Sequence, residues 1–259
     1  MNRAGLIVAL VIAVVVGGVF AISPGLDVAI MQPFHDISRS QHTFGLRLDP
    51  TVMFLRETAM WIVTAMALIV AGALAIKIAL PRRRLLVPGR AVVFLLGTLA
   101  LGPGVLANLT LKEHWGRARP VNVVPLSGTD RFVPWWDPRG PCPTNCSFVS
   151  GDVTGAYWTV AAAALAPPPW RALAYGGAIA FGLGVSALRV AAGAHFVTDA
   201  VFAGVFMFLV VWLAHGLIYR WPRTRLTDDD VERAIERFAI PPHDFLAGLF
   251  RRRRADTPK

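Results

Sequence analysis

The segment Arg189-Val190-Ala191-Ala192-Gly193-Ala194-His195-Phe196-Val197-Thr198-Asp199 lies between two apolar runs, at about residues 173–188 and 196–219. Removing charged groups from water is costly, so ionisable residues at a membrane boundary usually have a function. His195 and Asp199 are four residues apart, and on a helix their side chains would share one face and could hydrogen-bond. A carboxylate on one imidazole nitrogen would fix the tautomer and leave the other nitrogen free as a base or nucleophile.

The composition indicates a helical membrane protein. Of the 259 residues, 55% are hydrophobic and 16% are charged, whereas roughly 25% are charged in a typical soluble domain. Several apolar runs approach the roughly 20 residues that a helix needs to cross a bilayer. Much of the net charge of +10 lies beside these runs, at residues 82–84, 220–225 and 251–254. Such clusters indicate topology and contacts with anionic lipids, so we do not expect a nucleic-acid partner.

We predict an all-α, polytopic membrane protein with six transmembrane helices. The first apolar run is longer than the roughly 7–15 residues of a signal-peptide core, so we favour a retained helix over a cleaved signal. Pro103 and Gly104 are expected to kink the third helix. Residues 26–34 are predicted to be amphipathic and to lie on the outer surface. The six predicted helices cover about residues 5–23, 57–80, 91–111, 153–165, 173–188 and 196–219.

The basic clusters and the N-terminus agree on one topology, with both termini in the cytoplasm. The polar loop at 112–152 then lies outside the cytoplasm. Its two cysteines, Cys142 and Cys146, are predicted to form a disulfide in that compartment. The alternative, a metal site, requires further ligands, and His114 alone is weak support.

We predict a membrane domain at 1–225 and a cytoplasmic tail at 226–259. The acidic residues at 228–230 are typical of a helix start. Pro241-Pro242 is expected to break this helix before a basic amphipathic segment that binds anionic lipids of the inner leaflet. A frayed, solvated tail is an equally good alternative.

Three segments on the outer side favour anion binding. Lys112 and Arg119 are seven residues apart, so on a helix they would share one face and clamp an anion. Residues 147–152 begin the fourth predicted helix, where free N–H groups and the helix dipole attract phosphate. The third segment supplies Arg189, whose planar guanidinium suits phosphate. Lipid headgroup contacts, an ordinary N-cap and a structural histidine are separate alternatives, but together the segments indicate phosphate chemistry.

These residues resemble the motifs of the type 2 phosphatidic acid phosphatase superfamily, which are integral-membrane lipid phosphate phosphatases. The first family motif, K-x6-R-P, matches residues 112–120 fully. The third, S-R-x5-H-x3-D, matches at Arg189, His195 and Asp199, with Leu188 where serine is usual. The six expected helices, with the motifs facing outward, are also similar to this family.

The second family motif, P-S-G-H, reads Val149-Ser150-Gly151-Asp152 here, so the proline and the histidine are both missing. In the family, that histidine protonates the leaving oxygen. A free aspartic acid has a pKa of about 3.9 and is mostly ionised at neutral pH. Its surroundings could raise the pKa, although nearby cations would lower it. Alternatively, His114 could replace the acid, or Asp152 could activate water as a base.

The resemblance implies a two-step phosphoryl transfer that needs no metal or cofactor. His195 would attack phosphorus to form a phosphohistidine, Asp199 would hold its imidazole, and water would then release phosphate. Cations and donors of all three motifs would bind the phosphoryl oxygens, namely Lys112, Arg119, Ser150, Gly151 and Arg189.

We expect a bacterial inner-membrane lipid phosphatase whose active site faces the periplasm. Because Asp152 is a poor acid, we favour a leaving group that needs little protonation, as in a lipid diphosphate such as undecaprenyl diphosphate, or in a phosphate on a sugar anomeric carbon. Lipid A phosphate is the other favoured substrate. Phosphatidylglycerophosphate and phosphatidic acid are further candidates. A phosphotransferase would use the same intermediate. A catalytically inactive relative that binds phospholipid headgroups is an alternative of another class. The oligomeric state is left open.

Overall fold

The computed structural model describes residues 3–38 and 43–255, and the surroundings of side chains as far as residue 245. The described residues form helices joined by loops, with two isolated bridges and no strand. The chain divides into two compact units. The first contains Met1–Thr64 and Thr98–Ala214, and the second contains Ala65–Gly97 and His215–Lys259. All three sequence motifs belong to the first unit.

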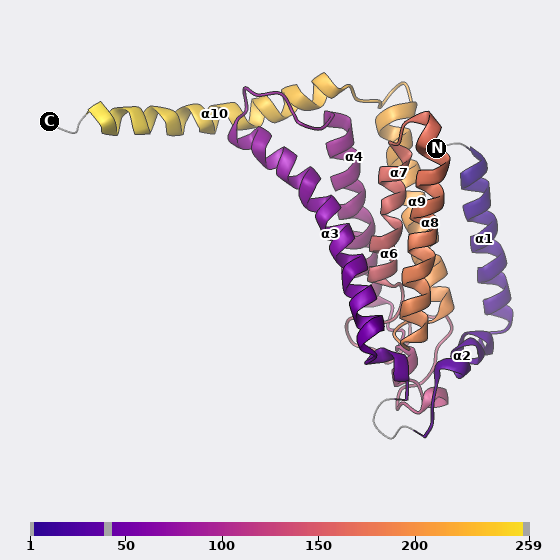
Figure 1. Cartoon of the computed structure of the whole chain (residues 1–259). Coiled ribbons are helices and arrows are strands. Elements are labelled where there is room, and N and C mark those ends of the chain that lie inside the picture. Colours follow the sequence, from indigo (N-terminus) through magenta and orange to yellow (C-terminus); the bar gives the residue numbers. More distant parts are fainter. Residues whose placement is uncertain (1–2, 39–42, 256–259) are drawn as a thin grey trace. The chain divides into compact units, whose positions relative to one another are not determined.

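Five helices among the described residues are long and apolar enough to cross a membrane (Figure 1). They are α1 (Arg3–Ile22), α3 (Pro50–Ala79), α4 (Gly89–Leu99) with its continuation to His114, α8 (Pro168–Ala191) and α9 (Val197–His215) with its continuation to Arg220. These five coincide with five of the six predicted spans. The sixth predicted span, 153–165, consists of two short helices, α6 (Gly151–Tyr157) and α7 (Thr159–Ala164), neither of which is long enough to cross a membrane.

The short helices α6 and α7 form much of the core of the first unit. Trp158 separates them and is fully buried, with its indole Nε1 donating to Thr98 Oγ1 at 3.1 Å. The ring of Tyr157 lies so close to Gly182 of α8 and Gly204 of α9 that a Cβ at either position would collide with it. Small residues at such crossings let helices approach closely. Glycine therefore allows α8 and α9 to pack around this ring.

The third predicted helix is continuous but changes its winding. It runs from α4 through a π-helical segment, η3 (Ala100–Leu111), into the short α5 (Lys112–His114). Pro103 lies inside η3, where the missing N–H and the proline ring disturb regular α-helical hydrogen bonding. π-Helical segments are frequent near functional sites. This one leads directly to Lys112.

The predicted amphipathic segment forms α2 (Gly25–Met31) and a 3₁₀ turn at Gln32–Phe34. It does not simply lie on the outer surface, because Asp27 and Met31 are buried inside the first unit. Met31 belongs to the main hydrophobic cluster, together with Phe44 and Phe196. The polar partners of Asp27, described below, explain why α2 packs against the protein.

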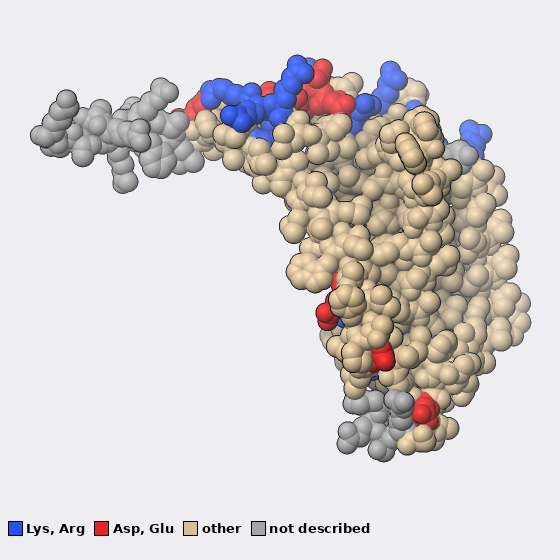
Figure 2. All heavy atoms as spheres, viewed as in Figure 1, with Lys and Arg blue, Asp and Glu red and all other residues tan. Residues whose placement is uncertain are grey.

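In the second unit, α10 (Asp228–Ala255) is one helix. The expected break at Pro241-Pro242 is wrong, because both prolines lie inside α10. Proline lacks an N–H donor, but its fixed φ of about −65° is compatible with a helix, so the chain continues in helical conformation through both residues. Thr227 and Asp230 form reciprocal hydrogen bonds at its start. Its acidic side chains lie near Arg82 and Arg84, and acidic and basic side chains gather in this part of the surface (Figure 2). The arginines predicted to bind anionic lipid, at 251–254, are outside the residues whose side chains are described.

Candidate active site

His195 lies in the loop between α8 and α9. The loop turns at Gly193, whose φ is +64° and whose missing Cβ leaves room for the ring of Phe44. The imidazole of His195 is buried, with 1% exposed, and its Nδ1 lies 2.8 Å from the backbone carbonyl oxygen of Ser147. A carbonyl oxygen only accepts hydrogen bonds, so Nδ1 carries the proton and donates it. The lone pair of the ring is therefore on Nε2.

Asp199 does not make the hydrogen bond to His195 that the i,i+4 spacing predicted. Its Oδ2 is 3.9 Å from Nδ1, which is an ion-pair distance but too long for a hydrogen bond. The carboxylate instead accepts from Ser147 Oγ at 2.5 Å and from the backbone N–H of Phe196 at 2.9 Å. Asp199 thus acts on the imidazole indirectly, by holding Ser147 and the loop that follows His195.

A buried ion-pair network supports Asp199, and the sequence-based reasoning missed it. Arg117 is fully buried and donates from Nη1 to Asp199 Oδ1 at 2.5 Å and from Nη2 to Asp27 Oδ2 at 2.7 Å. Thr198 donates its backbone N–H and its hydroxyl to Asp27. The guanidinium also lies over the ring of Phe196, 4.4 Å from its centre. The sequence offered one signal for this network: Asp27 is the single acidic residue among the largely apolar residues 1–34.

The loop closed by the Cys142–Cys146 disulfide holds Lys112 and Arg119. The two cations do not share a helix face as predicted, because α5 ends at His114 and the chain turns at Gly116, whose φ is +72°. The backbone N–H of Cys146 donates to the carbonyl oxygen of Lys112 at 2.9 Å. Arg119 Nη2 donates to the backbone and side-chain oxygens of Asn145, at 2.9 and 2.8 Å. The disulfide loop therefore contacts the first motif at the backbone of Lys112 and at the guanidinium group of Arg119.

The second motif begins α6. Ser150 is its N-cap, with Oγ accepting from the backbone N–H of Val153 at 3.4 Å. A Cβ on Gly151 would lie 2.7 Å from Asn108 Oδ1 and 3.0 Å from Lys112 Nζ. A side chain there would displace these two groups, so the ammonium group of Lys112 lies directly against the start of α6.

Asp152 is bound by two arginines rather than free. Its Oδ2 is 2.7 Å from Arg56 Nε and 3.3 Å from Arg189 Nε. Burial raises the pKa of Asp152, but the hydrogen bond from Arg56 and the charges of Arg189, Arg56 and Lys112 outweigh burial, so the pKa falls below its usual value. Asp152 is therefore ionised at neutral pH and is not a proton donor there. His114, the other candidate acid, is exposed at the end of α5.

The positive charges of the first and third motifs surround His195. Burial and then the charges of Arg119, Arg189 and Lys112 lower the pKa of His195 well below its ordinary value of 6.5. Burial, followed by the charge of Arg47, also lowers the pKa of Arg119. The Nε of Arg189 is buried and is paired with Asp152 at an ion-pair distance of 3.3 Å, but it makes no hydrogen bond among the described residues. The arrangement offers an anion several cationic groups beside a neutral imidazole, which is what nucleophilic attack on a phosphate requires.

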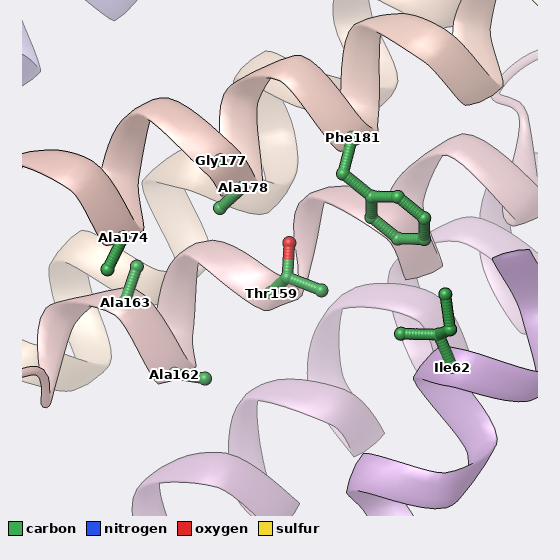
Figure 3. A pocket seen from close by; sticks show the side chains of 8 residues that line it. All are labelled: Ile62, Thr159, Ala162, Ala163, Ala174, Gly177, Ala178 and Phe181. Carbon is green, nitrogen blue, oxygen red and sulfur yellow. The ribbon is translucent and has the colours of Figure 1, made fainter.

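Within the part of the chain that the structure describes, no group of three His, Cys, Asp or Glu side chains is arranged to hold a metal ion. Two cavities of the first unit are mostly apolar. One, of 240 Å³, is lined by Arg56, Glu57, Met60, Trp61 and Thr64 and so adjoins the partner of Asp152. The other, of 390 Å³, lies among α3, α7 and α8, and the hydroxyl of Thr159 is the one polar side-chain group that lines it (Figure 3). It contains no site residue and suits hydrocarbon.

Sequence comparison agrees with this geometry. A lipid A 4′-phosphatase from Francisella tularensis subsp. novicida (strain U112) is 32% identical over 226 residues, covering 85% of this chain and 98% of that protein. Lipid A 4′-phosphatases from Rhizobium leguminosarum and Rhizobium etli (strain ATCC 51251 / DSM 11541 / JCM 21823 / NBRC 15573 / CFN 42) are 38% and 39% identical over 119 residues, 46% of this chain and 51% and 46% of those proteins. No solved structure matches the chain at a significant level.

The family model of the PAP2 superfamily matches residues 91–225. This range contains all three motifs, His195 and the cations around it. The apolar helices and the relatives make the protein a membrane phosphatase of lipid metabolism. The chain belongs to the PAP2 superfamily.

Proposed function

We propose that this protein removes the 4′-phosphate of lipid A in the bacterial inner membrane, with its active site on the periplasmic side. The names of the three relatives supply the substrate. The observation that carries the chemistry is the buried, neutral imidazole of His195, whose Nδ1 is bound by a carbonyl oxygen and whose pKa is lowered by burial and by the charges of Arg119, Arg189 and Lys112.

In the proposed mechanism, His195 Nε2 attacks phosphorus while the bond from phosphorus to the sugar oxygen breaks. The electron pair of that bond goes to the leaving oxygen, and a phosphohistidine remains. Water then attacks the same phosphorus, the P–N bond breaks, and inorganic phosphate leaves. Lys112, Arg119 and Arg189, with Ser150 Oγ and the N–H of Gly151, bind the phosphoryl oxygens and stabilise the charge of both transition states. No step in this scheme uses a metal ion.

Asp199 is a positioning group in this proposal. It holds Ser147, whose carbonyl oxygen accepts the Nδ1 proton of His195. As positive charge develops on the imidazole during attack, the carbonyl dipole and the carboxylate 3.9 Å away stabilise it. Because Ser147 already accepts the Nδ1 proton, the tautomer of His195 with an unprotonated Nε2 is fixed before the substrate arrives.

Orientation is inferred from the disulfide and from the direction of the helices. Disulfides persist in the periplasm and are rare in the cytoplasm, so the Cys142–Cys146 loop faces the periplasm. We count α6 and α7 as a sixth crossing, since most of their residues are buried in the first unit. A segment shielded by other helices does not need the long apolar surface of a lipid-exposed span. Six crossings place both termini in the cytoplasm.

The test is release of phosphate by the purified protein from three lipids: lipid A with both phosphates, undecaprenyl diphosphate and phosphatidic acid. We expect turnover of lipid A at the 4′ position and none by His195→Ala. Mass spectrometry of the product distinguishes the 1- from the 4′-position. Loss of the phosphate at position 1 alone, or preference for phosphatidic acid, would contradict the proposal. Absence of turnover on every lipid would favour a headgroup-binding relative.

The second candidate is a lipid diphosphatase, and the ionised state of Asp152 favours it. A diphosphate expels a phosphate monoester, which leaves without protonation. The undecaprenyl diphosphate arm of the same assay decides between the two. A lipid phosphotransferase would show in the same assay as labelled phosphate on an added acceptor lipid instead of in solution.

A further inference from the structure

We propose that Arg56 is a catalytic residue that stabilises the oxygen of the leaving group, and that Asp152 is the residue that positions it. The pair would thus replace the histidine that protonates this oxygen in other members of the family. The inference rests on the phosphatase function proposed above. It also explains how a chain with an acid in the second motif can expel a poor leaving group.

The geometry places Arg56 at the edge of the phosphate site. One oxygen of Asp152 binds the Nε of Arg56 at 2.7 Å and lies 3.3 Å from the Nε of Arg189. Asp152 directly follows Gly151, which lies against the ammonium group of Lys112. Arg56, which belongs to α3, therefore contacts the second motif directly.

The side chain of Arg56 also adjoins the space available to the rest of the substrate. It is 41% exposed and lines the 240 Å³ cavity together with Met60, Trp61 and Thr64. Residues 58–76 of α3 carry no charge, a length of about 28 Å at 1.5 Å per residue and close to the thickness of the hydrocarbon core. Arg56 thus lies at the headgroup end of this apolar run. An alcohol that leaves phosphorus toward the membrane passes the guanidinium.

The chemistry required at this point is charge stabilisation. When the P–O bond breaks, its electron pair develops on the leaving oxygen. Arg56 would donate an N–H hydrogen bond to that oxygen and supply a fixed positive charge, and the oxygen would take its proton from water. The water that later hydrolyses the phosphohistidine returns one proton to the solvent, so the reaction consumes one water overall. Guanidinium remains charged throughout the physiological pH range, so this assistance does not titrate there.

The alternative is that Arg56 and Asp152 form only a structural ion pair. Solvent-exposed ion pairs contribute little to stability, typically about 0–1 kcal/mol, and this pair is partly exposed, at 41% for Arg56 and 21% for Asp152. The chain offers a matched control in the pair Arg139–Asp137, whose arginine is 79% exposed and whose Nε lies 2.8 Å from the carboxylate. A structural role would make the two pairs respond alike to loss of the arginine.

The experiment compares two synthetic substrates that share one alkyl chain: an alkyl phosphate, whose leaving group is an alkoxide, and an alkyl-substituted phenyl phosphate, whose phenolate leaves easily. For Arg56→Gln we expect kcat on the alkyl phosphate to fall about 100-fold or more, and kcat on the phenyl phosphate to fall less than about tenfold. Asp152→Asn should show the same preference with smaller losses. Arg139→Gln should match the wild type on both substrates.

The double variant Arg56→Gln/Asp152→His tests the role directly, because it restores the family's proton donor. We expect it to regain turnover of the alkyl phosphate, with kcat falling as the new histidine loses its proton. This fall should occur below the ordinary histidine value of about 6.5, because the charges of Arg189 and Lys112 lower the pKa of a histidine at this position. Activity on the phenyl phosphate shows that each variant is folded. Equal losses on both substrates, or no recovery by the double variant, would overturn the proposal for Arg56. A wild type no more active than His195→Ala on either substrate would instead overturn the proposed phosphatase function.

Discussion

At the scale of single residues, the site depends on a histidine kept neutral among cations. Burial is the largest cause of the low pKa of His195, and the charges of Arg119, Arg189 and Lys112 act in the same direction. Since only the neutral imidazole is a nucleophile, activity falls as pH drops through this pKa. A histidine with the ordinary value would lose activity below about pH 6.5. Here the fall is expected at clearly lower pH.

Arg119→Gln should move that fall to higher pH. Removing this charge takes away one cause of the lowered pKa of His195, while burial, Arg189 and Lys112 remain. The acid side of the profile of kcat/KM against pH reports the pKa in the free enzyme. We also expect kcat/KM to drop about 100-fold, since a phosphate-binding cation is lost. If kcat/KM of Arg119→Gln falls at the same acidic pH as that of the wild type, Arg119 does not act on the pKa of His195.

The buried pair of Arg117 and Asp27 leads to a stability prediction. Removal of Arg117 leaves the carboxylates of Asp27 and Asp199 buried and without their shared cation. Arg117→Met should lower the stability by about 3–5 kcal/mol. Asp27→Asn should cost less, because Arg117 keeps its ion pair with Asp199. Thermal unfolding in detergent micelles measures both, and equal effects would contradict the proposed order.

At the scale of elements, the Cys142–Cys146 loop positions the first motif. Its residue Asn145 accepts two hydrogen bonds from Arg119 Nη2. A ring of about five residues contributes roughly 2 kcal/mol in the chain-entropy treatment. Reduction should therefore leave the protein folded but raise KM for the lipid. Cys142→Ser/Cys146→Ser serves as the control, with a raised KM that no longer responds to reductant. A wild-type KM unaffected by reductant would contradict this role.

In the second unit, α10 contributes the partners of a buried lysine on α3. Lys77 is 1% exposed and is held by Glu232 at 2.9 Å, Glu236 at 2.6 Å and the carbonyl oxygen of Arg83. A single change, Glu232→Gln or Glu236→Gln, leaves one carboxylate on the ammonium group. The double change removes both and should destabilise the unit by about 3–5 kcal/mol. Limited proteolysis at 226–245 measures the loss of stability. If the double change destabilises the unit only by the sum of two small single effects, the ion pairs with Lys77 do not stabilise it as proposed.

The sequence predicted long apolar helices well, because hydrophobic length is a local property. It could not predict that the helix at 153–165 divides at Trp158, since the break depends on how Tyr157 and Trp158 pack against other helices. From the motifs it also predicted a phosphate-binding set, which stays a prediction: Lys112, Arg119, Ser150, Gly151 and Arg189. The partners of Asp152 and Asp199 are Arg56 and Arg117, which meet them through tertiary contacts across 96 and 82 positions. Neither arginine is a fixed position of a motif, so no sequence pattern indicated these pairs.

At the scale of the whole molecule, helices serve as supports for a small site at their ends. α3, α6, α8 and α9 of the first unit each present at least one site residue, and α2 contributes the carboxylate that completes the buried network. The i,i+4 spacing of His195 and Asp199 suggested a direct hydrogen bond, but α9 begins at Val197, so His195 lies outside the helix and Ser147 bonds to both residues. The position of the imidazole is thus a property of the packed unit.

The central claim is that His195 forms a covalent bond to phosphorus. The most direct measurement is a rapid base-quenched reaction with lipid A labelled at the 4′-phosphate, followed by peptide mapping of the protein at alkaline pH. The account predicts base-stable, acid-labile label on the peptide containing His195, which is absent in His195→Ala. Turnover by His195→Ala, or label on another residue, would contradict it.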